Sequence, residues 1–436
     1  MARYAAPGER GSVVSYRDRY DHFIGGECVP PARGGYSADP SPVTGEVFTE
    51  VARGTAEDVH RALEAAHAAA PRWGRTSTSE RAHVLNEVAD RVEDHLDSLA
   101  VAETWDTGAP VREALADLPR AVDCFRHFAA VIRTQRGGVS DLGDDLLAYH
   151  FAEPLGVVDR FVPWRSPLLM AALDLAPALA AGNTALLRPS DRAPASIHVL
   201  VDLVGDLLPP GVVNVVNGVG SEEDEPSGGK GADVFFADVA DRRDAFYDRA
   251  LEGFATFALD RALVQTPIHD RFLTDAVERA RAAGPGHPLD TDTTVGALTG
   301  HDQLDRTLSL IEVARRDGAR VVCGGERVDL GGELSGGSYL APTVVVGESR
   351  VARSELVGPV VWVTSFDHFD DAVKELSGTA SGVGVWSREA GVGFRAGRRI
   401  RTRRVRVNTF RPGAADHHAL LDQYQRTKTI LVEQGA

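Results

Sequence analysis

The chain has 436 residues, of which 43% are hydrophobic and 25% are charged, so it is long enough to build two or three hydrophobic cores. Its formal net charge of −16 argues against a general nucleic-acid-binding protein, because such proteins present clustered basic groups to phosphates. The cysteines Cys28, Cys124 and Cys323 form neither a disulfide framework nor a Cys-x-x-Cys metal motif. We therefore predict a cytoplasmic protein without a metal site.

The most apolar stretch, residues 167–187, is too polar for a membrane span. It contains Asp174, Pro177 and Asn183, which favour a buried helix followed by a strand. The first twenty residues mix charged and polar side chains and lack the apolar core of a signal peptide. We expect neither a membrane nor a nucleic acid as a partner.

The first third of the chain is predicted to be mainly helical. Apolar residues recur at helical spacing over 54–70, 77–104 and 111–132. Ser77 and Glu80 have the spacing of a capping box, in which each side chain binds a backbone N–H of the first turn. The second predicted helix therefore begins at Ser77.

From residue 147 onward, predicted strands alternate with predicted helices. The first series comprises strands at 147–162, 184–187 and 212–216 and helices at 167–180 and 193–207. A second series begins near Asp233 and ends in a short strand at 427–432. Such alternation is typical of parallel βαβ units, so we predict an α/β fold with a doubly wound sheet and two interdigitated domains.

Several segments, in this order along the chain, resemble the aldehyde dehydrogenase superfamily. They include FIGGE (23–27), EPLGVVDRFVPW (153–164), APALAAGNTALLRPSD (176–191), PPGVVNVVNG (209–218) and YQRTKTILV (424–432). The resemblance covers nearly the whole chain. It implies a Rossmann-type cofactor domain, a catalytic α/β domain and a small β-rich oligomerisation element, which together oxidise aldehydes with NAD or NADP as dimers or tetramers.

The same resemblance divides the chain. Residues 1–135 and 148–227 are expected to form a truncated Rossmann-type cofactor domain, and residues 228–410 the catalytic-type domain. Residues 136–158 and 411–436 are expected to form the oligomerisation element, whose terminal strand extends a partner's sheet.

The catalytic positions that the resemblance assigns hold unusual residues. The family's chemistry requires a thiolate nucleophile, an amide that stabilises an oxyanion and a carboxylate that activates water. Thr256 stands where the cysteine belongs, Arg165 follows Pro-Trp in place of asparagine, and Pro226 stands in place of glutamate. Glu225 lies one residue before Pro226, so shifting the alignment by one residue would place a carboxylate at the family's glutamate position. A threonine hydroxyl is far less acidic than a thiol.

The cofactor-binding region is also shortened. Only the residues 219–227 stand where the family places a strand, a glycine-containing turn, a helix and another strand, and a βαβ unit needs about 30 residues. The family's glycine-rich loop is missing after Asn408. The positions that face the cofactor in the family are retained in vestigial form at Trp164, Arg188, Asp191 and Glu355.

These departures lead to three hypotheses. The first is a catalytically inactive, structural or regulatory subunit that assembles with itself or with an active aldehyde dehydrogenase paralogue and needs no cofactor. The second is a divergent NAD(P)-dependent dehydrogenase that oxidises an aldehyde to an acid or thioester and gives Arg165 or Glu225 new roles. The third is a binding module for another small ligand. We expect the first.

Overall fold

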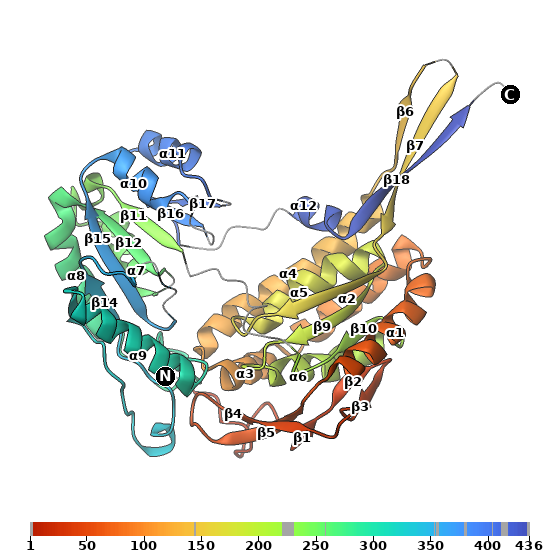
Figure 1. Cartoon of the computed structure of the whole chain (residues 1–436), viewed down its shortest axis with the longest axis horizontal. Coiled ribbons are helices and arrows are strands. Elements are labelled where there is room, and N and C mark those ends of the chain that lie inside the picture. Colours follow the sequence, from red (N-terminus) through yellow and green to blue (C-terminus); the bar gives the residue numbers. More distant parts are fainter. Residues whose placement is uncertain are drawn as a thin grey trace.

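The computed structural model describes residues 3–143, 145–219, 231–257, 259–352, 354, 357–378, 382–402, 404–410 and 417–433. These residues form two α/β lobes and a narrow arm that projects from the first lobe (Figure 1). The N-terminal lobe contains a five-stranded sheet and helices α1–α6, and the C-terminal lobe contains a seven-stranded sheet and helices α7–α11.

The sheet of the N-terminal lobe has the strand order β3-β2-β10-β9-β8. Strands β8, β9 and β10 run parallel, whereas the hairpin β2–β3 pairs antiparallel with β10. A separate small sheet has the order β1-β5-β4. The strand bounds are β1 Arg19–Tyr20, β2 His22–Ile24, β3 Glu27–Val29, β4 Tyr36–Pro40, β5 Val47–Ala52, β8 Val157–Val162, β9 Thr184–Pro189 and β10 Val213–Val215.

Six helices surround this sheet, and α2, α4 and α5 share one large hydrophobic core with it. Helix α5 is buried along nearly its whole length because it lies between α4 and the sheet, which explains its continuous apolar sequence. The bounds are α1 Ala56–Trp73, α2 Thr78–Glu93, α3 Leu96–Thr107, α4 Val111–Thr134, α5 Pro167–Ala181 and α6 Ala195–Val204, followed by the 3₁₀ helix η1 Gly205–Leu207.

The helix predicted over 77–104 is in fact two helices. Its start is confirmed, since Ser77 Oγ accepts from the Glu80 N–H and Glu80 Oε2 accepts from the Ser77 N–H, both at 3.1 Å. The prediction of a continuous helix was wrong because the backbone leaves helical geometry at His95, with φ −125° and ψ 24°. Apolar spacing continues across this break and conceals it.

The strand predicted over 147–162 is also divided. Residues Leu146–Pro154 form β7 in the arm, and β8 begins at Val157. Gly156 between them has a φ of 114°, which is a conformation that side-chain-bearing residues rarely adopt. This turn sends the two halves into different sheets.

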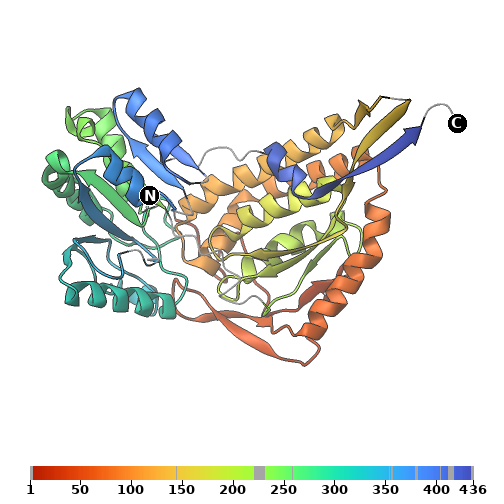
Figure 2. The ribbon, with the colours of Figure 1, turned by 45° about the horizontal axis from the view of Figure 1, so that its top comes forward.

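The sheet of the C-terminal lobe has the order β13-β14-β15-β12-β11-β16-β17 and is parallel except for β13. Its strands are β11 Ala232–Phe235, β12 Arg261–Gln265, β13 Arg320–Cys323, β14 Thr343–Val346, β15 Val360–Phe366, β16 Val383–Trp386 and β17 Val405–Val407. Its helices are α7 Ala245–Ala255, α8 His269–Ala282, α9 His301–Arg316, α10 Phe369–Leu376 and α11 Ala390–Arg399, with 3₁₀ helices η2 Ala237–Ala240, η3 Thr266–Ile268 and η4 Gly332–Leu334. The two lobes stand side by side in Figure 2.

The arm is an antiparallel sheet with the order β18-β7-β6. Its strands are β6 Gly138–Asp141, β7 Leu146–Pro154 and β18 Gln425–Glu433, and helix α12 His417–Asp422 precedes β18. Tyr424 anchors the arm to the N-terminal lobe: its carbonyl accepts from Asn183 Nδ2 at 2.9 Å and its hydroxyl donates to Asp174 Oδ1 at 2.7 Å. Within the described part of the chain, no helix is long and apolar enough to cross a membrane.

The lobes meet where α3 ends and α4 begins. The N–H of Val111 donates to the Pro288 carbonyl at 2.8 Å, and Thr299 Oγ1 donates to the Thr107 carbonyl at 2.8 Å. The start of α4 therefore lies at the boundary between the two lobes.

Candidate active site

The turn between β8 and α5 carries Trp164 and Arg165. Ser166, the N-cap of α5, has left-handed backbone angles of φ 47° and ψ 52°, which is unusual for a residue other than glycine and often found at functional sites. Pro167 follows at the first helical position, where a missing N–H costs nothing. The backbone of this turn is thus fixed on both sides of Arg165.

Two buried carboxyl groups of α3 hold the first turns of α5 and α6. Glu103 Oε2 accepts from the Leu168 N–H at 2.9 Å, and Asp106 Oδ2 accepts from the Ser196 N–H at 2.7 Å. Burial raises the pKa of Glu103 to about 8 and that of Asp106 to about 7. Neither residue is predicted from the sequence, although their spacing of three on one helical face is a detectable signal.

Arg165 is exposed and lies against Trp164, with its Cζ atom 5.0 Å from the centroid of the indole ring. Its neighbour Ser166 donates to Asp117 Oδ2 at 2.9 Å, and Asp117 Oδ1 accepts from Arg120 at 2.6 Å. The second turn of α4 therefore faces the turn that carries Arg165.

Glu113, in the first turn of α4, belongs to the same cluster. Glu113 is an exposed residue, yet desolvation of its carboxyl group and the nearby Asp117 raise its pKa to about 7. Arg165 and Arg112 oppose this rise, so both guanidinium groups lie close enough to favour the ionised carboxylate. A carboxyl group that titrates near neutrality can exchange protons at physiological pH.

The described candidates for cofactor binding lie at the carboxyl ends of the parallel strands. Trp164 follows β8, and Arg188 and Asp191 lie at and just beyond the end of β9, which is the edge where α/β sheets bind nucleotides. Arg188 donates from Nε to Asp159 Oδ1 at 2.8 Å and from Nη1 to the Val219 carbonyl at 3.2 Å. A cation and a carboxylate at this edge fit the phosphate and the ribose hydroxyls of a dinucleotide.

The remaining predicted positions lie either on the C-terminal lobe or outside the described residues. Thr256 lies on the C-terminal lobe as the C-cap of α7, where its hydroxyl donates to the Gly253 carbonyl at 2.8 Å. Phe257 follows with a φ of 53°, so this position, like Arg165, precedes a left-handed residue. Pro226, Glu225 and Glu355 lie outside the described residues.

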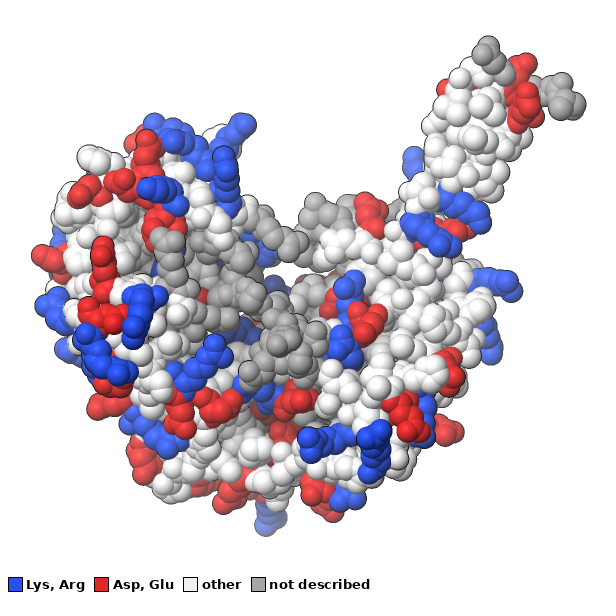
Figure 3. Space-filling view, viewed as in Figure 1, with Lys and Arg blue, Asp and Glu red and all other residues white. Residues whose placement is uncertain are grey.

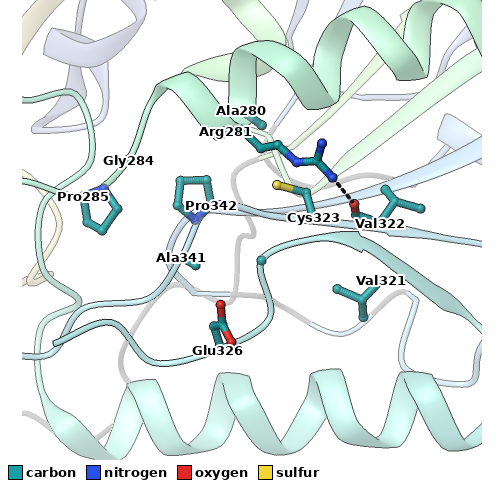
Figure 4. Close-up of a pocket in the computed structure, with 11 residues that line it drawn as sticks. Ala280, Arg281, Gly284, Pro285, Val321, Val322, Cys323, Glu326, Ala341 and Pro342 are labelled. Atoms are coloured by element: carbon teal, nitrogen blue, oxygen red, sulfur yellow. Dashed lines mark hydrogen bonds between the residues drawn. The ribbon is translucent and has the colours of Figure 1, made fainter.

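The three thiols lie elsewhere. Cys28 is exposed on β3, and Cys124 is buried in α4, where desolvation raises its pKa to about 12. Cys323 lines a separate pocket of about 420 Å³ between α8 and β13–β14, beside Arg281 and Glu326 (Figure 4). None of the residues lining that pocket is among the predicted site residues.

The profile of the aldehyde dehydrogenase family matches residues 33–226 and 228–420, which together make up most of the chain. The chain belongs to the aldehyde dehydrogenase family. Its mixed α/β fold with a Rossmann-like and a catalytic domain agrees with that membership. It is similar over its whole length to solved structures of the family, including PnpE from Pseudomonas sp. WBC-3 (TM-score 0.89, 29% identity, covering 96% of this chain and 98% of that one). A mutant of the P. syringae indole-3-acetaldehyde dehydrogenase AldA, in complex with NAD⁺ and IAA, gives a TM-score of 0.88 at 28% identity and 97% coverage of both chains.

Relatives of higher identity are named for aldehyde oxidation. A probable aldehyde dehydrogenase of Streptomyces coelicolor is 48% identical over 496 positions, covering 99% of this chain and 98% of the relative. The fluoroacetaldehyde dehydrogenase of Streptantibioticus cattleyicolor is 48% identical over 501 positions, covering 100% of this chain and 99% of the relative.

These relatives contradict the prediction of a catalytically inactive subunit. Proteins named as dehydrogenases match this chain from end to end at almost half of the aligned positions, and the prediction gave too much weight to the substituted positions and the shortened segments. The alignment of 501 positions with a chain of 436 residues leaves 65 positions without a counterpart here. Segments of the relatives are therefore absent from this chain.

Proposed function

We propose that the chain is an aldehyde dehydrogenase that oxidises an aldehyde to a carboxylic acid with NAD⁺ or NADP⁺ as the hydride acceptor. The observation that carries this proposal is the full-length similarity, at 48% identity, to a fluoroacetaldehyde dehydrogenase. The complex of a structurally similar protein with NAD⁺ supports the choice of cofactor. The truncated cofactor segment and the substitution at Thr256 make this chain a divergent member.

The residues at the carboxyl edge of the N-terminal sheet support this function. Arg188 would contact the phosphate or ribose of the cofactor, and Asp191 and Trp164 flank it. When bound, the cofactor supplies the acceptor for the hydride. The aldehyde must first add a nucleophile, because direct loss of hydride from a carbonyl would leave an acyl cation.

The nucleophile in this chain is expected to be oxygen, supplied by water or by the Thr256 hydroxyl. Cys124 is buried and its pKa is raised to about 12, so it provides almost no thiolate at neutral pH. Cys28 is exposed on β3, and Cys323 is buried at the end of β13. Glu113, whose pKa is about 7 and which lies in the first turn of α4, would accept the proton of the attacking water.

The test is a direct assay of the purified full-length chain. Fluoroacetaldehyde, acetaldehyde and aldehydes with larger or charged substituents are offered with NAD⁺ or NADP⁺, and absorbance at 340 nm is followed. We expect reduced cofactor and the matching acid in equal amounts, with none from heat-denatured protein. Absence of reduced cofactor with every aldehyde and both cofactors would refute the proposed function.

The arm supports a further part of the proposal, which is self-association. Large apolar side chains are exposed along the arm, and Figure 3 shows that most of its visible surface is uncharged. These side chains are Val139, Leu142, Phe151, Ile430, Leu431 and Val432. Contiguous exposed apolar surface of this kind is typical of protein interfaces. The prediction of an active paralogue as the partner depended on the hypothesis of an inactive subunit, so it is withdrawn together with that hypothesis.

The predicted division into domains, with a cofactor domain at 1–135 and 148–227, a catalytic-type domain at 228–410 and an oligomerisation element at 136–158 and 411–436, stays part of the proposal. So does a cytoplasmic location. The support for the latter is that Cys28, Cys124 and Cys323 are all free thiols.

A further inference from the structure

Arg165 is an exposed cation without an ion pair among the described residues, although the Glu113 carboxyl group lies close enough to interact with its charge. It makes no ion pair or side-chain hydrogen bond with the described part of the chain, and its one defined contact is with the face of Trp164. Two acids of the facing helix α4 lie in this region: Asp117 accepts from both Arg120 and Ser166, and Glu113 interacts with the charge of Arg165 without a hydrogen bond to it. The guanidinium group is therefore held in place by stacking, with its N–H donors available.

The position of this cation points toward the substrate. In the family resemblance, the residue after Pro-Trp faces the carbonyl oxygen of the aldehyde, and here that residue is Arg165. The left-handed Ser166 and the buried Glu103, which binds the N–H of Leu168, fix the backbone around it. A fixed turn at the lobe boundary presents the guanidinium group in one place.

A guanidinium group suits a carboxylate better than it suits a single oxyanion. Its planar fork offers two parallel N–H donors, which match the two oxygens of a carboxylate and form short, charge-assisted hydrogen bonds. A short side-chain amide offers one donor to one oxygen instead. The substitution thus changes which chemical group is recognised at this position.

We propose that Arg165 forms an anionic subsite and that the preferred substrates are small aldehydes carrying a carboxylate within a few carbons of the carbonyl group. This inference rests on the proposed function for the oxidation step, but the subsite itself is a property of the folded chain. The oxidised product carries two carboxylates, so it also fits the subsite.

The first experiment measures binding without cofactor or turnover. Malonate and succinate, which resemble the products, are titrated into the full-length protein by calorimetry at pH 6.5, with propionamide as a neutral control ligand. We expect dicarboxylate binding that weakens about 10- to 100-fold in Arg165→Ala and less in Arg165→Lys, which keeps the charge but loses the fork. Arg133→Ala, which removes an exposed arginine from the last turn of α4, is the matched control and should leave binding unchanged.

Circular dichroism and thermal melting confirm that each variant is folded. Equal dicarboxylate affinity in the wild type and in Arg165→Ala would overturn the inference, and so would the absence of dicarboxylate binding by the wild type. Neither outcome bears on oxidation of neutral aldehydes, so it leaves the proposed function standing.

The second experiment compares kcat/KM for aldehydes of matched length, namely succinic semialdehyde and butanal, together with the shorter glyoxylate. We expect the charged substrate to be preferred and Arg165→Ala to lower the ratio of charged to neutral kcat/KM about 10-fold or more, chiefly through KM. An unchanged ratio would overturn the inference. Dicarboxylate binding without any reduced cofactor would instead refute the proposed function and leave the subsite in place.

Discussion

The Glu103 carboxyl group accepts a hydrogen bond of 2.9 Å from the backbone N–H of Leu168, across 65 residues of chain. This bond fixes the first turn of α5 directly after the turn that carries Arg165. A buried acid in α3 thus positions a residue of the candidate site through a helix terminus.

The first prediction concerns stability and pH. In the unfolded chain, carboxyl groups ionise near pH ~4, whereas burial raises the folded-state pKa of Glu103 to about 8 and of Asp106 to about 7. The folded state therefore holds more protons than the unfolded state between these values. Their contribution to the free energy of unfolding is fully present below pH ~4 and is lost as the pH rises through about 7 to 8.

Unfolding of the N-terminal lobe in urea is monitored through hydrogen exchange of the α5 amides. The urea concentration at the midpoint of unfolding should be higher at pH 5.5 than at pH 8.5. Glu103→Gln should reduce this difference, since the amide does not titrate. Glu64→Gln, at an exposed position of α1, is the control and should retain the full difference. An unfolding midpoint of α5 that rises with pH would contradict the raised pKa values assigned to Glu103 and Asp106.

The second prediction concerns Glu113 and ligand binding. Its pKa of about 7 means that it is mostly neutral at pH 6 and mostly ionised at pH 8. The other charged groups facing it are Asp117 and Arg112 on α4 and Arg165 on the neighbouring turn. The ionised Glu113 competes with a ligand carboxylate for Arg165, so dicarboxylate affinity should fall as the pH rises through 7. Titrations between pH 6 and 8.5 should show this fall in the wild type and a flat profile in Glu113→Gln.

The third prediction is that aldehyde oxidation does not depend on a thiol. Iodoacetamide should label the exposed Cys28 rapidly and Cys124 very slowly, because burial raises the pKa of the latter thiol to about 12. Peptide mass spectrometry measures the labelling and reduction of NAD⁺ measures the activity. Activity should stay within about twofold of the untreated enzyme, and Cys28→Ser should behave alike. A loss of activity in step with alkylation of one cysteine would instead identify that residue as the nucleophile.

The fourth prediction concerns the arm. Leu431 on β18 is 60% exposed, so its side chain gains little from its own chain. If this surface is covered by a second copy, Leu431→Glu places a charge in an apolar interface and should shift the protein toward monomers. Light scattering coupled to size-exclusion chromatography measures the mass. Thr427→Glu, an exposed change nearer the base of β18, should perturb the mass less. A wild-type protein that is monomeric at every concentration would disprove self-association through the arm.

Local patterns in the sequence determined most of the secondary structure. The capping box at Ser77 and the alternation of strands and helices after residue 147 depend on neighbours within one or two turns, so they can be detected without a fold. The short hairpin β2–β3 escaped detection because strands of three residues carry too little periodicity.

The ordered motifs placed the chain in its family, but three substituted positions, a shortened cofactor segment and a missing glycine-rich loop led to a wrong prediction of inactivity. A motif compared position by position shows which side chain stands at Thr256 or Arg165, yet it does not show which groups surround that side chain. The relatives that match at 48% identity outweigh those departures.

Only the tertiary structure decided the environment of the candidate site. It brought Glu103 to the N-terminus of α5, Asp117 to Ser166 and Glu113 near Arg165, and it buried Cys124 and Cys323 while leaving Cys28 exposed. Helix spacing and motifs are set by contacts a few residues apart, whereas desolvation and charge pairing depend on residues that are distant in the chain and meet only when it folds. For this reason the sequence identified Arg165, and the fold showed that its guanidinium group is held in place without an ion-pair partner among the described residues.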